Sequence, residues 1–163
     1  MSTSDNVFVD AAVEELAGWL PGVLGARPLT ADWLTEQQRL FVVAAESPDR
    51  ELSLLLSPNE YGDAEPEPEP EDFSAIDGYP ADLQVRLVGP RDDETQQREC
   101  RAVFERLVAA RPDVPMLLVN NLDTLIAAHL PEAGTHYFDK SITPDDPDIE
   151  TWRPWVRLPA GGS

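Results

Sequence analysis

Apolar residues recur at helical spacing along two long stretches of the chain. The stronger stretch, residues 93–111, opens on a capping-box pair, Asp93 and Gln96, and stops before Pro112. The other, residues 9–20, is expected to end at Pro21 and Gly22. The apolar positions are Val9, Val13, Leu16 and Leu20 in the earlier stretch, and Cys100, Val103, Phe104, Leu107 and Val108 in the later one. Each pattern predicts an amphipathic helix with one face against a sheet.

A shorter helical pattern follows Asn120 and Asn121, either of which can cap it, and Pro131 ends it. Its apolar members are Leu122, Leu125, Ile126 and Leu130. His129 would then lie at the end of this helix, where an imidazole beside the terminal carbonyls has a structural role. The chain is thus expected to contain two or three helices.

Runs of apolar and β-branched residues predict strands between these helices. Residues 39–46 and 51–57 flank a turn at residues 47–50, which is the pattern of a hairpin. Further strands are expected at residues 82–89, 115–119 and, as an edge strand, 136–138. The positions expected to face the core are Leu52, Leu54, Leu56, Leu83, Val85 and Leu87. Trp33 and Leu34 are expected to pack inward from a short turn.

The order of these elements predicts a single α+β domain over residues 1–163. Its sheet is expected to be mainly antiparallel, with about 4–5 strands and one face open to water. The path from residue 82 to residue 119 would form a right-handed crossover if its two strands are parallel neighbours.

An acidic, proline-rich insertion separates the second and third predicted strands, over residues 59–79. Its central run is "EPEPEPEDF", and the whole insertion contains eight acidic residues and no basic ones. Proline cannot join a strand ladder and like charges repel, so an extended, disordered loop is predicted. The loop is either a solvated tether or a surface that contacts a basic partner.

The composition gives 31 acidic residues against 12 basic ones, a formal net charge of −19. Without the eight acids of the insertion, 23 acids still face 12 bases, a charge of −11. This charge disfavours nucleic acid and anionic membranes and favours a basic protein as partner. No stretch has the roughly 18 apolar residues that a membrane span needs, and no signal peptide is recognised, so a cytoplasmic protein is expected. The single Cys100 excludes an internal disulfide and is expected to be a buried, inert thiol.

No phosphate-binding glycine loop, paired CxxC, HExxH or nucleophile elbow is present, so we expect neither a catalytic site nor a cofactor. His136 and Asp139 are close enough in sequence to suggest an acid–base or metal pair, but a structural role is favoured. The run at 143–152 invites a calcium interpretation yet lacks the spacing and glycine of an EF-hand, so no metal site is assigned. Asp148 or Thr143 capping a helical turn is the favoured alternative.

The C-terminal tail, residues 151–163, begins with the most aromatic stretch near either terminus. Trp152 and Trp155 either fold back onto the core or anchor another chain. Together with the acids they form the predicted contact surface for a partner, which consists of Glu65, Glu67, Glu69, Glu71, Asp72, Asp145, Asp146, Asp148, Trp152 and Trp155.

Composition and size together lead to the hypothesis of a small acidic protein that docks on a basic protein and neutralises it. Immunity proteins of bacterial toxins are comparable in size, acidity and α+β class, although no residues are aligned with them. A secretion chaperone or adaptor is an alternative, and an exposed apolar groove along the sheet would favour it. An enzyme with scattered catalytic acids and His136, or a mimic of DNA charge, are weaker alternatives.

Overall fold

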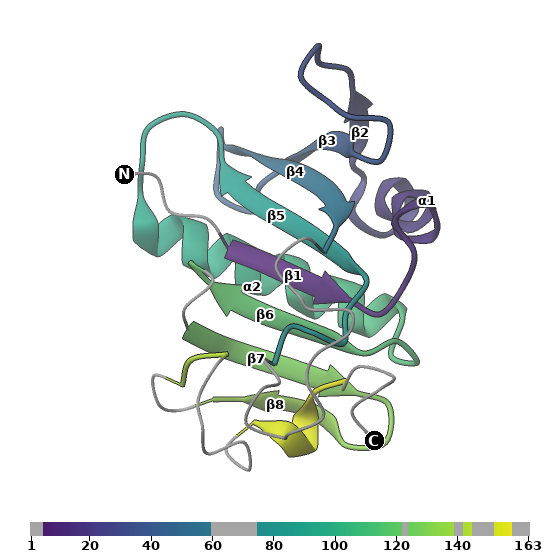
Figure 1. Ribbon diagram of the computed structural model, residues 1–163. Coiled ribbons are helices and arrows are strands. Elements are labelled where there is room, and N and C mark those ends of the chain that lie inside the picture. The colour runs from purple at the N-terminus through teal and green to yellow at the C-terminus, as the bar shows by residue number, and fades with distance from the viewer. Residues whose placement is uncertain (1–4, 60–74, 122–123, 139–141, 145–151, 158–163) are drawn as a thin grey trace.

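The computed structural model describes residues 5–59, 75–121, 124–138, 142–144 and 152–157. Within these ranges the chain forms one eight-stranded sheet, two α-helices and a single turn of 3-10 helix (Figure 1). The strands are β1 (Asp5–Val9), β2 (Arg27–Leu29), β3 (Arg39–Ala44), β4 (Glu51–Pro58), β5 (Ala81–Leu87), β6 (Met116–Asn120), β7 (Thr124–Leu130) and β8 (Gly134–Tyr137). The helices are α1 (Val13–Leu24) and α2 (Asp93–Ala110), and the 3-10 turn is η3 (Arg153–Trp155). The predicted α+β class is confirmed, with more strands than expected.

The strand order is β2-β3-β4-β5-β1-β6-β7-β8, and every neighbouring pair is antiparallel. β5 and β6 both pair with β1, so they run parallel to each other with β1 between them. The path from β5 through α2 to β6 is therefore a crossover, but its strands are not neighbours. The N-terminal strand β1 occupies the interior of the sheet, although no strand was predicted there and its last residue, Val9, was assigned to a helix.

The first predicted helix is wrong at both ends. Val9 belongs to β1, where its backbone pairs with Ala81 and Met116, and α1 starts only at Val13. The helix also continues through Pro21 to Leu24. It ends at Gly25, whose φ of 72° allows Gly25 N–H to reach Pro21 O (3.0 Å) and Ala26 N–H to reach Leu20 O (3.4 Å). Glycine in the left-handed conformation, and not proline, ends this helix.

The third predicted helix is absent, because residues 124–130 form β7. Asn121 has a φ of 52°, a turn conformation, and β7 then pairs with β6 on one side and β8 on the other. The spacing of a short apolar run fits a helix and a buried strand equally well. Here the pairing of β7 with both β6 and β8 favours the strand.

The remaining predictions of regular structure are close to the observed elements. β3, β4, β5, β6 and the edge strand β8 all overlap the predicted runs, and Leu52, Leu54, Leu56, Leu83 and Val85 are buried, with Leu87 partly buried. α2 is capped one residue earlier than predicted, by Asp92, which accepts from Thr95 N–H (3.1 Å). Gln96, the other half of the predicted capping box, instead accepts a bond from Leu87 N–H (3.1 Å).

The sheet has a core on each face. Both helices pack on one face, where Leu16, Leu20, Phe104 and Leu107 meet alternate residues of β1, β4, β5 and β6. The opposite face of β1, β6 and β7 is covered by Ala75, Ile76 and Tyr79 and by Trp152 and Val156. Figure 1 looks onto this second face, with α2 behind the sheet and η3 in front of it. We call it the helix-free face.

Candidate functional site

Most of the predicted partner-contacting acids lie outside the described residues. This applies to Glu65, Glu67, Glu69, Glu71 and Asp72, and to Asp145, Asp146 and Asp148. Of the insertion predicted at 59–79, the structure describes Asn59 and residues 75–79. These residues are ordered against the sheet, because Asn59 donates to Ile76 O (2.9 Å) and Tyr79 O (2.8 Å) and Tyr79 is buried.

The two acidic segments, residues 60–74 and 145–151, adjoin the same point of the fold. Ala75, the first described residue after the first segment, donates its N–H to the carbonyl of Pro144 (2.8 Å). Pro144 is the last described residue before the second segment. Both ends lie over the helix-free face, where Ala75 belongs to the second core. Segments that are 70 residues apart in sequence thus join the fold at one place.

The two tryptophans of the predicted contact surface have different environments. Trp152 is 1% exposed and packs in the core of the helix-free face, so it is not available on the surface of this structure. Trp155 is half-buried, and its ring stacks on His136 with centroids 3.8 Å apart and planes 8° apart. Phe138 meets both rings edge-on. This aromatic cluster joins η3 to the edge strand β8.

The two histidines have structural contacts. His129 lies in β7, not at a helix end, and its ring nitrogens contact Thr135 Oγ1 and Pro112 O, both at 2.8 Å. His136 stacks on Trp155, while its suggested partner Asp139 lies outside the described residues. Among the described residues, no group of three or more His, Cys, Asp and Glu side chains could hold a metal ion.

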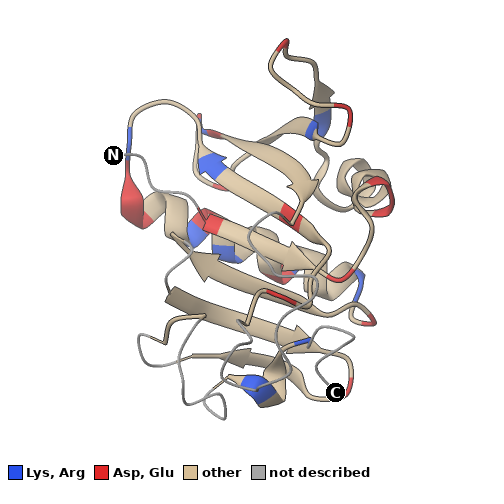
Figure 2. Cartoon of the chain, in the orientation of Figure 1, with Lys and Arg blue, Asp and Glu red and all other residues tan. Residues whose placement is uncertain are grey.

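The negative charge is unevenly divided along the chain. The described ranges contain 18 acidic residues and 11 arginines, a charge of −7, and the remaining positions contain 13 acids and Lys140, a charge of −12. Figure 2 shows the acidic and basic residues of the described part interspersed over strands, helices and loops. The described part is therefore mildly acidic, and the excess lies mainly in the segments that adjoin Ala75 and Pro144.

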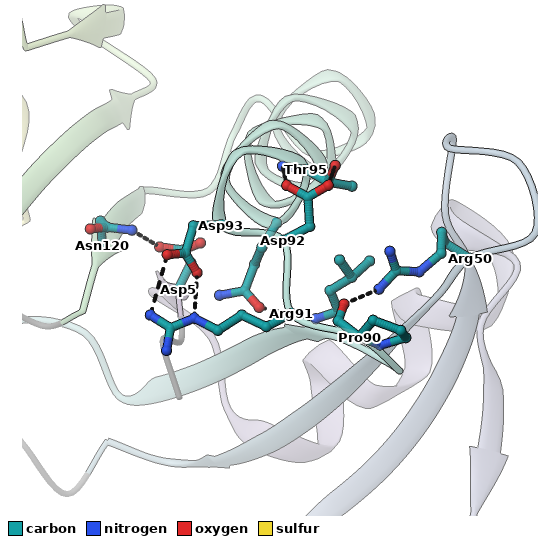
Figure 3. A network of polar contacts seen from close by, with 10 residues as sticks. Asp5, Arg50, Pro90, Arg91, Asp92, Asp93, Thr95 and Asn120 are labelled. Atoms are coloured by element: carbon teal, nitrogen blue, oxygen red, sulfur yellow. Dashed lines mark hydrogen bonds and ion pairs between the residues drawn. The ribbon is translucent and has the colours of Figure 1, made fainter. Parts of the chain in front are cut away.

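A pocket of about 250 Å³ lies on the helix side of the sheet, between α2 and β1, β6 and β7. Its lining residues on the strands are Asp5, Leu118, Asn120 and Ile126. Those on α2 are Glu94, Gln97, Arg98, Cys100 and Arg101. Asn120 donates to Asp5, and Figure 3 shows this pair beside Asp93 and Arg91 at the start of α2. Asp5 is 2% exposed, and its Oδ2 has no hydrogen-bond partner among the described residues.

Burial raises the pKa of Asp5, and hydrogen bonding to Cys100 and Asn120 only partly offsets this. Burial likewise raises the pKa of Cys100, as expected for an inert thiol. Asp5 and Cys100 both lie on the helix side of the sheet, whereas His136 lies on the helix-free face with Trp155. The sheet separates Asp5 from His136, so these two groups do not form an acid–base pair.

One further buried acid fixes the hairpin of β3 and β4 to α2. The carboxylate of Glu99 accepts bonds from Glu46 N–H (2.8 Å), Ser47 N–H (2.8 Å) and Ser47 Oγ (2.7 Å). Burial raises the pKa of Glu99, but these hydrogen bonds outweigh burial and leave the pKa below its ordinary value. Sequence reasoning missed both Glu99 and Asp5. Glu99 precedes Cys100, a member of the predicted apolar stripe, but the pattern placed Glu99 itself on the other, charged face of the helix.

No family of known proteins matches the chain, and neither does any curated protein or solved structure. Neither helix of the described part is long and apolar enough to cross a membrane.

Proposed function

We propose that this protein docks on a basic partner protein through its acidic segments and neutralises that partner, as an immunity protein or protein inhibitor does. The observation that supports this most strongly is the hydrogen bond between Ala75 and Pro144. This bond joins the residue that follows the first acidic segment to the residue that precedes the second, so the two segments have a common origin on the rigid sheet. Local charge density is thereby higher than either segment provides alone, and such a density accelerates association with a basic surface.

The rigidity of this origin follows from the contacts around it. Asn59 ties the start of the insertion to residues 76 and 79 with two hydrogen bonds. Tyr79 in turn accepts a bond from Arg157 N–H at its hydroxyl (2.9 Å), and Trp152 packs in the same core. These contacts hold the described residues at which both segments join the fold.

The chaperone alternative calls for an apolar groove along the sheet. On the helix-free face, the apolar residues of β1, β6 and β7 are covered by residues 75–79 and 152–156, so this part of the sheet offers no open groove among the described residues. We therefore keep docking on a basic protein as the proposed function.

The test begins with recovery of the partner. The tagged chain is incubated with extract and culture supernatant of the native host, washed at low and at moderate salt, and the retained proteins are identified. A basic protein that is released as salt rises, and whose own activity the purified chain inhibits, is the expected result. Recovery of no basic protein at either salt concentration contradicts the proposal.

Two charge-matched variants then locate the contact. The triple variant Glu65→Gln, Glu67→Gln, Glu69→Gln removes three charges from the insertion, and Glu15→Gln, Glu94→Gln, Glu132→Gln removes three from exposed positions of the body. The insertion variant should weaken binding and reduce its dependence on salt, with the body variant close to wild type. Equal weakening by both variants would show that only the net charge matters.

A further inference from the structure

The loop between β2 and β3, residues 30–38, projects from the edge of the sheet (Figure 1). It is held in a defined shape by turn hydrogen bonds, from Leu34 N–H to Ala31 O (3.2 Å) and from Gln38 N–H to Thr35 O (3.2 Å). The Gln38 side chain also accepts from Thr35 N–H (3.1 Å). Side chains on this loop are therefore presented on a structured support.

The loop exposes the largest apolar side chain on the described surface. Trp33 is 61% exposed, contrary to the expectation that it packs inward, and Leu29 at the end of β2 is 43% exposed. A pocket of about 280 Å³ lies at the base of the loop, lined by Leu29, Leu34, Leu40 and Phe41. A single exposed apolar residue is ordinary, but an exposed tryptophan on a loop with an apolar pocket at its base is the arrangement of an interface anchor.

The charges around this surface are complementary to a basic partner. Both nearby arginines are already paired, Arg27 with Glu51 (3.5 Å) and Arg39 with Glu14 (3.7 Å). Asp32 and Glu36, which flank Trp33, have no ion pair among the described residues. A lysine or arginine beside the Trp33 ring would gain a cation–π contact and an acidic neighbour together.

This loop is also joined to the strand from which the acidic insertion leaves. Gln38 Nε2 donates to Ser57 Oγ (3.4 Å), and β4 ends one residue later at Pro58. A protein attracted to the acids that follow β4 thus approaches the same end of the sheet as the loop. The acids that attract the partner and the aromatic ring that anchors it then leave from the same end of the sheet.

We propose that Trp33, with Leu29 and the pocket beneath them, is the apolar anchor by which this protein holds its basic partner. The inference rests on the proposed function and adds the contact that slows dissociation. A second copy of the chain is a poor occupant, because two molecules of charge −19 repel and each would place Asp32 and Glu36 opposite the other's. Backbone pairing at this edge is also restricted, since Pro28 in β2 lacks an N–H.

The decisive experiment measures the affinity and dissociation rate of the basic partner recovered above, for Trp33→Ala and for a matched control. Val88→Ala is the control, because Val88, at 44%, is the large apolar side chain exposed on the described residues outside the surface formed by Trp33 and Leu29. Trp33→Ala should weaken binding by about 30-fold or more, chiefly through faster dissociation, and Trp33→Phe should restore part of it. Both alanine variants should unfold at the wild-type temperature.

The outcomes separate this inference from the function it rests on. Wild-type affinity of Trp33→Ala for a salt-sensitive basic partner overturns the anchor and leaves the proposed function standing. Failure to recover any basic partner overturns both. Concentration-dependent dimerisation of the wild-type chain, measured by light scattering and abolished in Trp33→Ala, would show that the surface holds a second copy and would also overturn the inference.

Discussion

At the scale of single residues, two buried carboxyl groups affect stability in opposite directions. Glu99 is a satisfied anion that accepts three hydrogen bonds from the β3–β4 hairpin, whereas Asp5 is buried with one oxygen lacking a partner in the described structure. Burial alone therefore does not determine the effect of an acid on folding. The effect depends on the number of hydrogen-bond donors that reach the carboxylate.

Glu99→Gln is expected to lower the free energy of unfolding by about 1–3 kcal/mol, because the amide cannot accept from all three donors. The lowered pKa of Glu99 means that its contribution is present above the unfolded pKa and is lost as pH falls through the folded one. Urea unfolding at several pH values should thus show the largest gap between variant and wild type near neutral pH. Glu132→Gln, at an exposed position of the β7–β8 turn, is the control and should unfold as wild type.

Asp5→Asn is expected to stabilise the protein at neutral pH. The raised pKa of Asp5 means that its favourable contribution is complete below the unfolded value of 3.8 and is lost as pH rises through the folded pKa. The variant does not ionise, so its advantage in thermal unfolding should grow from acid to neutral pH. A variant that is less stable than wild type at neutral pH would show that the ionised carboxylate has a partner that supports it.

At the scale of elements, the end of α1 shows how backbone conformation can override a sequence signal. Pro21 and Gly22 both predicted an end that the helix passes, and Gly25 in the left-handed conformation ends it instead. Proline removes one N–H bond and crowds the carbonyl four residues earlier, but these costs do not end the helix here, and three more residues remain helical.

Two glycine substitutions in this helix should have opposite signs. Gly25→Ala is expected to destabilise the protein by about 1 kcal/mol, because alanine is strained at a φ of 72°. Gly22→Ala lies inside the helix, where an added Cβ meets nothing within 4 Å, and should stabilise by about 0.5–1 kcal/mol. Thermal unfolding of the pair checks this, and a loss of stability in both would place the helix end at Gly22.

The elements that sequence reasoning identified are those with unambiguous periodicity. α2 has a long stripe and a cap, and β4 alternates cleanly, so both were predicted nearly at their observed bounds. β1 was missed because its pairing partners are distant in sequence, and β7 was missed because its short apolar run fits a helix and a strand equally well. Val7 of β1, for example, pairs with both Leu83 and Leu118. The contacts of Asp5 and Glu99 were unpredictable because their partners are likewise distant in sequence.

At the scale of the whole molecule, most of the negative charge belongs to positions other than the described residues. The described body has a charge of −7, and Asp5 and Glu99 among its acids are buried in it, while the other positions have −12. The charge of −11 outside the insertion includes the acids of residues 145–151, which adjoin the same point of the fold as residues 60–74. The fold holds Ala75 and Pro144 together, and the acidic segments that adjoin these two residues contain most of the negative charge.

Deletion of residues 63–72 should leave the melting temperature within about 2 °C of wild type, because the two cores and the hydrogen bonds from Asn59 to residues 76 and 79 are formed by residues outside the deleted segment. Asn59 and Tyr79 remain in place to close the shortened loop. Differential scanning calorimetry of the deletion variant checks this expectation, and a large drop would mean that the insertion stabilises the fold.

The measurement that tests the central claim most directly is the dissociation constant of the recovered basic partner as a function of salt, for wild type and for the deletion of residues 63–72. The account predicts that wild-type binding weakens steeply as salt rises and that the deletion variant binds more weakly with a shallower slope. Binding that does not respond to salt, or that is unchanged by the deletion, would contradict it.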